Sequence, residues 1–319
     1  MNPQRLALLF IAGLVLAGCG RSSQGQLRVG FAQIGSESGW RAAETNVAKQ
    51  EAAKRHVDLS ISDAQQRQEN EIRAIRAFIA QRVDAILLAP VVSTGWDGVL
   101  EEAKAAKIPV VLLDRQIETG KPDLYLSSVA ADSVHEGEIA GDWLVGKVGS
   151  KPCNVLELQG TLGASVATDR KKGFEQAIAK APNVKIVRTQ SGDFTRSTAK
   201  QVMESFIKAE QGRPICAVFA HNDDMMIGAI QAMEEAGLKP GQDILTVSID
   251  GVPDIFKAMT DGKANATVEL TPDMAGPALD LLTAYKTKGQ VPPKWVKTES
   301  RLYLPDTAKA EYERRKALY

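Results

Sequence analysis

Short apolar stretches alternate with amphipathic segments along most of the chain. The apolar stretches have the length of buried strands, and the segments between them carry apolar residues at helical spacing, as Ile72, Ile75 and Phe78 do. The expected strands are 27–31, 59–62, 85–88, 110–113, 124–129, 154–158, 184–189, 217–220, 244–249 and 264–270. The expected helices are 42–54, 68–81, 98–106, 132–148, 170–180, 195–209, 225–236, 253–260 and 274–286. This alternation predicts βαβ units, and therefore parallel sheets with helices on both faces.

The units fall into two sets of similar length, which predicts an α/β fold of two doubly wound parallel-sheet domains. Ahead of them stands a segment of residues 1–26. We expect an N-terminal lobe of residues 27–128 plus 269–301 and a C-terminal lobe of residues 129–268 plus 302–319. The three expected crossings between the lobes lie near 127–130, 267–270 and 301–303. Three parallel connections favour a hinge, because a few residues can absorb the rotation.

Residues 1–26 have the pattern of a targeting segment and tether rather than of a folded domain. Arg5 supplies positive charge, and residues 6–16 form an apolar run too short to span a bilayer as a helix. The run ends in Leu16-Ala17-Gly18-Cys19, which resembles a bacterial lipoprotein signal, cleaved before a Cys that then carries lipid. Simple secretion with cleavage near Cys19 is the alternative. Either interpretation predicts a periplasmic or cell-envelope protein, and the first adds a lipid anchor through Cys19.

Export changes what the three cysteines mean. If Cys19 carries lipid, Cys153 and Cys216 remain as a pair in an oxidising compartment. Both come at the start of predicted strands, the first and third of the second domain. These strands are neighbours in the common order 2-1-3-4-5, so the two thiols can fall within bonding reach. We therefore predict a Cys153–Cys216 disulfide, with two buried free thiols as the alternative.

Composition and charge restrict the possible functions. Hydrophobic residues make up 44% and charged residues 24%, as in a soluble globular protein. Lys plus Arg and Asp plus Glu are equal at 39 each, so no basic excess calls for nucleic acid. Residues 1–26 offer a signal segment where a repressor of this fold would need a helix-turn-helix headpiece.

No catalytic set emerges from the sequence. The three histidines, His56, His135 and His221, lack the spacing of a metal site or triad. Residues 35–39 have Glu where a nucleophile elbow needs Ser, and residues 160–163 lack the Lys of a phosphate-binding loop. The pair Asp223-Asp224 could ligate a metal, but carboxylates at a helix N-terminus are the simpler interpretation. We expect neither an enzyme nor a cofactor or metal site.

Polar clusters follow the strands in both predicted domains. Carboxyl ends of parallel strands meet at one edge of a sheet, so these clusters should converge on one cleft. They are Asp114-Arg115, Gln159-Gly160-Thr161 with Asp169-Arg170, Gly192-Asp193-Phe194, His221-Asn222-Asp223-Asp224, Asp250-Gly251 and Glu269. Each alone is usually a cap or a turn. Together they predict a ligand site between the domains.

The segment after the first strand, residues 35–41, adds a distinctive mixture of side chains. It holds a carboxylate, hydroxyls, an indole and a guanidinium in Glu37, Ser38, Trp40 and Arg41. Charged groups suit the hydroxyls of a polyhydroxylated ligand, and a flat apolar ring suits its C–H surface. The alternative is an ordinary loop with a half-buried Trp40 and Glu37 facing water.

These clusters resemble those of periplasmic sugar-binding proteins of the ribose/galactose-binding type, the extracytoplasmic components of ABC transporters. The strings that carry the resemblance are Asp114-Arg115, Asp169-Arg170-Lys171-Lys172-Gly173-Phe174, His221-Asn222-Asp223-Asp224 and Ile249-Asp250-Gly251. Residues 35–46, 89–92, 157–160 and 191–196 are similar to galactofuranose-binding members. The resemblance covers essentially the whole mature chain and implies a type I periplasmic binding protein fold.

The resemblance also implies roles for particular residues. Residues expected to bind sugar oxygens are Asp114 and Arg115 from the first domain and Arg170, Asn222 and Asp250 from the second. Trp40 would be a stacking platform and Phe194 would cover the other face of the sugar. Glu269 stands where ribose binders usually have Gln, which puts ribose in doubt. Glu37, Trp40 and Arg41 differ most from a generic ribose binder and would choose the sugar, and Ser38 in the same segment is also expected to bind the ligand.

The function implied is capture of a monosaccharide in the interdomain cleft and its delivery to an ABC permease. Galactofuranose is the expected ligand, with arabinose or galactose as further candidates, and a monomer is usual for such proteins. The alternatives are a subunit that presents the sugar to a chemoreceptor or sensor kinase and, from another class, a sugar-modifying enzyme.

Overall fold

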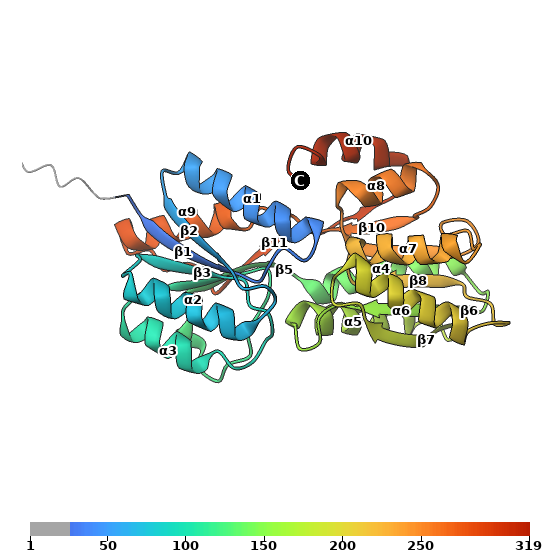
Figure 1. The fold of residues 1–319 in the computed structure, drawn as a ribbon, viewed down its shortest axis with the longest axis horizontal. Helices are drawn as coiled ribbons and strands as arrows, with labels where there is room; N and C mark the ends of the chain where they lie inside the picture. Colours follow the sequence, from blue (N-terminus) through green and yellow to red (C-terminus); the bar gives the residue numbers. More distant parts are fainter. Residues whose placement is uncertain (1–25) are drawn as a thin grey trace, which may run out of the picture.

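Two open α/β lobes make up residues 26–319, the part of the chain that the computed structural model describes (Figure 1). Each lobe is built around one six-stranded sheet, which confirms the predicted fold class. The expected signal segment and the lipidation of Cys19 lie outside the described residues. Among the helices of residues 26–319, none combines the length and apolar character needed to cross a membrane.

The first sheet has the strand order β11-β5-β4-β3-β1-β2, and all its neighbours pair in parallel. Its strands are β1 (Arg28–Gln33), β2 (Asp58–Asp63), β3 (Ala85–Leu88), β4 (Val110–Leu113), β5 (Ser127–Ala131) and β11 (Trp295–Thr298). Its helices are α1 (Gly39–Lys54), α2 (Gln68–Ala80), α3 (Asp97–Ala105), α9 (Ala275–Lys288) and a short 3-10 turn at Pro122–Leu124. Every residue of β3 and β4 is buried, because α1 and α9 cover one face of the sheet and α2 and α3 the other (Figure 1).

The second sheet repeats this plan in the order β12-β10-β9-β8-β6-β7, with β12 as an antiparallel edge. Its strands are β6 (Cys153–Gln159), β7 (Val184–Ser191), β8 (Ala217–Ala220), β9 (Leu245–Asp250), β10 (Ala266–Glu269) and β12 (Leu302–Tyr303). Its helices are α4 (Ser133–Val148), α5 (Ser165–Ile178), α6 (Arg196–Ala209), α7 (Asp223–Glu235), α8 (Pro253–Thr260) and α10 (Pro305–Arg315). Both sheets therefore contain the predicted order 2-1-3-4-5.

The chain crosses between the lobes three times, after β5, after β10 and between β11 and β12. β5 continues to Ala131, so residues 129–131 lie in the first sheet, past the predicted boundary at residue 128. Glu269 ends β10 and lies in the second sheet. The strand β11 is not predicted by the sequence pattern. It is an edge strand of alternating exposed and half-buried residues, without an apolar run.

Glycines allow α4 and α5 to pack closely. A Cβ atom at Gly173 would lie 1.9 Å from the Val134 carbonyl oxygen, and one at Gly137 would lie 2.2 Å from the Arg170 carbonyl oxygen. Any larger residue would push the helices apart. The close packing brings Arg170 on α5 against Glu136 on α4, and their side chains bond at 3.0 Å. The helix contact thus fixes one of the predicted site residues.

The predicted disulfide is confirmed: Cys153 and Cys216 are bonded, with their Cα atoms 5.0 Å apart. Cys153 begins β6 and Cys216 immediately precedes β8, and these two strands are neighbours in the second sheet. The bond lies at the amino ends of the strands. It therefore joins the end of the sheet opposite to the one at which the predicted site residues gather.

Candidate functional site: a cleft between the lobes

A cleft lies between the carboxyl ends of the two sheets, with about 270 Å³ of free space when the solvent at its mouth is included. The first lobe contributes Glu37, Ser38, Trp40, Arg41, Asp114 and Arg115, and the second contributes Arg170, Phe194, Asn222 and Asp250. The structure therefore brings together every predicted ligand-binding residue except Glu269. Val166 and Leu270 complete the lining. Nothing in the sequence marks these two apolar residues, because each looks like ordinary core.

Helix α1 starts earlier than its sequence suggests, and this changes the setting of the first-lobe wall. The Ser38 hydroxyl accepts a hydrogen bond from the Arg41 N–H at 3.1 Å and caps the helix. Trp40 and Arg41 therefore stand on the first turn of a helix rather than in a loop. The Trp40 indole is buried, and its Nε1–H donates to the Leu270 carbonyl oxygen at 3.0 Å. A side chain held in this way has little freedom to adjust to a ligand.

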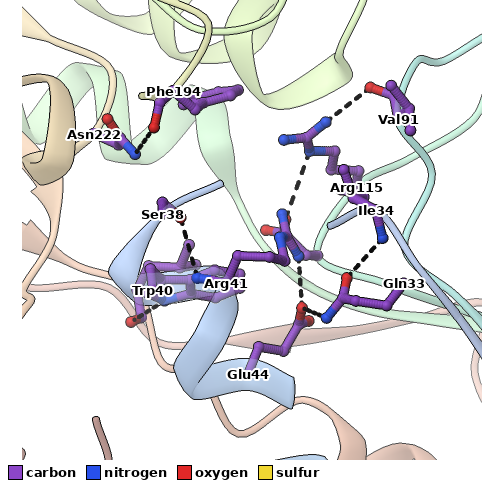
Figure 2. A network of polar contacts seen from close by, with 12 residues as sticks. Gln33, Ile34, Ser38, Trp40, Arg41, Glu44, Val91, Arg115, Phe194 and Asn222 are labelled. Atoms are coloured by element: carbon purple, nitrogen blue, oxygen red, sulfur yellow. Dashed lines mark hydrogen bonds and ion pairs between the residues drawn. The ribbon is translucent and has the colours of Figure 1, made fainter. Parts of the chain in front are cut away.

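Arg41 is the centre of a buried ion network in the first lobe (Figure 2). Its guanidinium bonds Glu44 and Asp114 at 2.6 Å each and lies 3.4 Å from Glu37. Burial alone would lower the pKa of Arg41, but these three carboxylates outweigh it and raise the pKa above its ordinary value. The Gln33 amide donates to Glu44 at 3.0 Å and continues the network below the cleft floor. Arg41 is thus permanently charged and oriented toward Asp114.

Arg115 is held mainly by the main chain. Its Nη1 donates to the Val91 carbonyl oxygen at 2.8 Å, and its guanidinium carbon lies 5.1 Å from the centre of the Phe194 ring, across the cleft (Figure 2). Its Nε is buried without a hydrogen-bond partner. Burial, together with the positive charge of Arg41, lowers the pKa of Arg115. An unpartnered donor in a buried cation is costly unless a ligand meets it, so this nitrogen is suited to a ligand oxygen.

Glu71 supports the same loop from α2 without reaching the cleft. Its carboxylate accepts from the Val91 N–H at 3.0 Å, so Val91 is held from both sides. Burial raises the pKa of Glu71 to about 8. The sequence gives no sign of this residue, because Glu71 is one polar position among several in the first turns of an amphipathic helix.

Arg170 organises the second-lobe wall. Its Nε bonds Glu136 at 3.0 Å, its Nη1 donates to the His221 carbonyl oxygen at 2.8 Å, and its Nη2 lies 3.9 Å from Asp250. Burial works to lower the pKa of Arg170, but Glu136, Asp250 and Asp114 raise it overall. Burial raises the pKa of the Asp250 carboxyl well above its usual value, and Arg170 opposes that rise. The charged form of Asp250 is therefore stabilised when a hydroxyl donor or a cation faces its carboxylate.

Asn222 caps helix α7 and also lines the cleft. Its side-chain oxygen caps α7 by accepting from the Met225 N–H at 2.9 Å, and its Nδ2 donates to the Phe194 carbonyl oxygen at 3.3 Å. Figure 2 shows Asn222 beside Phe194, on the side of the cleft facing Arg41 and Arg115. The amide has two hydrogens, so one remains for a ligand. Phe194 itself is buried. It and the preceding residue have left-handed backbones, with φ of 54° at Asp193 and 59° at Phe194.

The turn that carries Asp250 is held by groups outside the cleft. Asp250 has a φ of 126°, a region that strongly favours glycine. Asp223 accepts hydrogen bonds from the Gly251 and Val252 N–H groups, at 2.6 and 2.8 Å. Arg315, on α10, donates to the Gly251 carbonyl oxygen at 3.0 Å. Asp223 is therefore a buried turn-organising carboxylate at a helix N-terminus, and the metal-ligand alternative gains no support.

His221 is buried and paired and does not line the cleft, although it belongs to one of the polar clusters that predict the site. Its Nδ1 accepts from the Gly160 N–H at 3.3 Å, and its Nε2 lies 3.2 Å from the Glu157 carboxylate. Burial lowers the pKa of His221. Burial raises the pKa of Glu157, but the bond to His221 and further donors lower it to about 2. This pair joins β8 to the end of β6 and steadies the main-chain oxygen that receives Arg170.

Glu269 does not reach the cleft, contrary to the role expected for it. Its carboxylate pairs with Arg301 at 2.7 Å and with Arg315, on the side of β10 that faces α10. The next residue, Leu270, lines the cleft instead. Successive residues of a strand point to opposite faces, so a shift of one position exchanges a cleft residue for an outer one. Through Arg315, Glu269 is linked to the Gly251 carbonyl oxygen beside Asp250.

The arrangement suits a neutral ligand rich in hydroxyl groups. Arginines and carboxylates from both lobes face one small space, and a hydroxyl can donate to a carboxylate while accepting from a guanidinium. Trp40 and Phe194 supply flat apolar surface beside these groups. Within residues 26–319, no cluster of three or more His, Cys, Asp or Glu side chains is placed to hold a metal ion.

Comparison with known proteins agrees with this geometry. The family model described as a periplasmic binding protein domain matches residues 29–290. The chain belongs to this family. The resemblance predicted from the polar clusters is thereby confirmed, and this periplasmic binding protein shares its two-lobed plan with many solved structures.

Individual relatives are similar over nearly their whole length. The galactofuranose-binding protein YtfQ of Escherichia coli is 64% identical over 310 residues, which are 97% of this chain and 98% of the relative. A crystal structure of a galactofuranose-binding protein matches with a TM-score of 0.91 and 67% identity over 92% of this chain and 99% of that one. The arabinose transporter component of Shewanella sp. ANA-3, bound to α- and β-L-arabinofuranose, matches with a TM-score of 0.89 and 54% identity, over 91% of this chain and 97% of that one.

Proposed function

We propose that this protein is the extracytoplasmic solute-binding component of an ABC sugar importer, and that its ligand is galactofuranose. The observation that carries the proposal is the set of buried charged groups that face the cleft from both lobes, Arg41, Asp114 and Arg115 on one side and Arg170 and Asp250 on the other. The names of its relatives, which refer to galactofuranose and to arabinofuranose, support a furanose ring.

The cleft geometry also supports selectivity among sugars. A sugar that lacks one hydroxyl, or has it inverted, would leave a buried charged group without a partner, which costs about 3–5 kcal/mol for a broken buried pair. Arg115 Nε has no hydrogen-bond partner and lies 3.7 Å from the Asp114 carboxylate, so Arg115 is especially dependent on the ligand. We expect discrimination between furanoses and pyranoses to exceed discrimination between sugars that share a furanose ring.

Ligand capture would be coupled to closure of the lobes. The cleft takes residues from both sheets, so a bound sugar contacts both lobes only in the closed form and stabilises that form by its differential affinity. The permease would then receive the closed, loaded protein. The protein would release the sugar unchanged, because no step of the proposal involves its chemical conversion.

The experiment is isothermal titration calorimetry with D-galactose, L-arabinose and D-ribose, combined with NMR of ¹³C-labelled galactose bound to the protein. The expected result is binding of galactose with the anomeric signal of the furanose form, although free galactose is mostly pyranose. An Arg115→Ala variant should lose binding. Arg76→Ala is the matched control, because Arg76 pairs with Glu102 on the exposed surface. A bound signal of the pyranose form, or no binding of any of the three sugars, would contradict the proposal.

We further propose that the mature protein is periplasmic, lipid-anchored through Cys19 and monomeric. The string Leu16-Ala17-Gly18-Cys19 and the disulfide, which requires an oxidising compartment to persist, support export. Labelling of cells with radioactive palmitate should mark the protein, and Cys19→Ser should abolish the label. Light scattering of the soluble mature domain should give the mass of one chain. A Cys19→Ser variant that stays labelled would exclude the anchor.

A further inference from the structure

A second pocket adjoins the cleft at the hinge. It is a larger space than the cleft and is partly open to solvent, and Asp114 and Val166 line both spaces. We name it the hinge pocket, lined also by Gln116, Ser133, Ser165, Asp169 and Trp295. Like the cleft, it takes residues from both lobes. A ligand that fills the cleft therefore lies next to a larger space, across the side chains of Asp114 and Val166.

Trp295 gives the hinge pocket an aromatic wall. Its side chain keeps 38% of its surface exposed, although it is a large apolar group on a β-sheet edge. Its orientation is fixed, because Nε1–H donates to the Ala130 carbonyl oxygen at 3.0 Å and the Lys297 ammonium lies 4.3 Å from the ring centre. A rigid, partly exposed indole beside polar groups suits the C–H face of a sugar ring.

One unused acceptor, the Asp169 carboxylate, lines the same pocket. Among the described residues, none forms a hydrogen bond or ion pair with the Asp169 carboxylate, which is half-buried on the second turn of α5. Burial raises the pKa of Asp169, and the nearby carboxylate of Asp132 adds to the rise although Lys172 opposes it. A hydroxyl group of a ligand would relieve both effects by donating to this carboxylate.

The walls of the hinge pocket are already ordered, and their charge limits what can enter. The Gln116 amide donates to the Ser128 hydroxyl at 2.7 Å, and its main-chain N–H donates to the Ser165 hydroxyl of the other lobe at 2.9 Å. The lining includes the carboxylates of Asp114, Asp132 and Asp169 but no Lys or Arg. Asp114 and Asp132 are paired with Arg41 and Lys297, so the negative charge left to face a ligand is that of Asp169, which favours a hydroxyl donor and disfavours a phosphate or a uronic acid.

We propose that the hinge pocket is a subsite for the second ring of a neutral disaccharide or glycoside whose first ring occupies the cleft. The proposal rests on the proposed function, since it presumes a sugar in the cleft. Trp295 would stack on the second ring, and Asp169 would accept a hydroxyl hydrogen. The ligand class would then include short galactofuranosyl glycosides as well as the free sugar.

Calorimetry with two probes, D-galactose and a disaccharide of two linked galactofuranose rings, tests the subsite. The wild-type protein should bind the disaccharide at least as tightly as galactose. Trp295→Ala should weaken disaccharide binding about tenfold and leave galactose binding unchanged, because the lost contact involves only the second ring. Trp295→Phe, which keeps a flat ring, should recover part of the loss. Val291→Ala, at a residue 74% exposed, is the control and should change neither affinity.

The outcomes separate the two proposals. Binding of galactose without binding of the disaccharide would overturn the subsite and leave the proposed function intact. Equal weakening of both sugars by Trp295→Ala would mean that Trp295 only supports the hinge. If Trp295→Ala does not fold, Asp169→Asn takes its place and should weaken the disaccharide selectively. Failure of the wild-type protein to bind either sugar would overturn the proposed function, and the subsite with it.

Discussion

The two walls of the cleft use similar side chains in different ways. In the first lobe, the buried atoms Glu37 Oε2, Glu44 Oε1 and Arg115 Nε have no hydrogen-bond partner. In the second lobe, Arg170 and Asn222 are bonded to main-chain oxygens of their own lobe. Both walls offer bonding groups to a ligand, but the first keeps buried side-chain atoms without a hydrogen-bond partner, whereas the second is bonded more completely to its own main chain. We infer that first-lobe changes act mainly on affinity and second-lobe changes mainly on stability.

Arg170→Ala should have the largest effect of any single change in the cleft. The change removes the buried guanidinium that pairs with Glu136 and Asp250, and the negative charges of these two carboxylates are then uncompensated. We expect the free energy of unfolding of the ligand-free protein to fall by about 3–5 kcal/mol, measured by urea denaturation. The exposed Arg76→Ala should change it by less than about 0.5 kcal/mol. An unaltered midpoint for Arg170→Ala would remove the distinction between the walls.

Arg115→Ala should have a small effect on ligand-free stability and a large effect on sugar affinity. Its loss removes one bond to Val91 but also relieves repulsion with Arg41, so ligand-free stability should change by about 1 kcal/mol or less. Sugar affinity should fall about 100-fold or more, because a charged partner of the ligand is lost. Calorimetry and urea denaturation on the same preparation give both numbers. Parallel losses of affinity and stability would place Arg115 in the scaffold.

Glu71 lets the first wall be probed by pH. Its pKa is raised by burial from 4.5 to about 8, so the folded protein holds a proton that the unfolded chain releases above its own pKa. Stability should therefore fall as pH rises from about 4.5 to about 8, on the order of 1 kcal/mol per pH unit for this group. Glu71→Gln should flatten that slope in thermal melts between these limits. A variant whose melting temperature follows the wild-type pH profile would show that Glu71 is not the source.

Asp224 should have the smallest effect, because it joins the walls rather than building either. Its Oδ2 accepts from the Gly39 N–H of the other lobe at 2.8 Å. Asp224→Ala removes this bond and also the ion pair of Asp224 with Arg196 in its own lobe, and it should favour the open form and lower sugar affinity about three- to tenfold. Asp224→Asn keeps an acceptor oxygen and should lie between. Small-angle scattering without sugar should show a more open protein for Asp224→Ala. Identical scattering curves for the variant and the wild type would mean that the bond between Asp224 and Gly39 does not hold the lobes together.

Much of this architecture can be predicted from the sequence, because a doubly wound sheet leaves a regular pattern. The strand and helix alternation, the Cys153–Cys216 bond and the clusters at strand ends all follow from it. The choice between Glu269 and Leu270 does not, since it depends on which face a strand residue takes at the end of β10. The edge strand β11 cannot be predicted from the sequence pattern either, because its side chains are exposed or half-buried and leave no apolar run.

The supporting carboxylates are the other part that the sequence does not reveal. Glu71 and Glu136 lie near the starts of amphipathic helices, where acidic residues are common for reasons of helix stability alone. Their role arises only when distant segments pack, Glu71 against Val91 and Glu136 against Arg170. No spacing rule connects residues so far apart in the chain.

The bond from Arg315 to Gly251 has a consequence for biogenesis. Arg315 follows every residue that lines the cleft in chain order, yet it holds the turn next to Asp250. A chain that emerges with its amino end first therefore completes this wall only after α10 has been delivered. Until α10 packs against the second sheet, the Gly251 carbonyl oxygen lacks this donor, so the turn beside Asp250 is the part of the site that depends on the last helix of the chain.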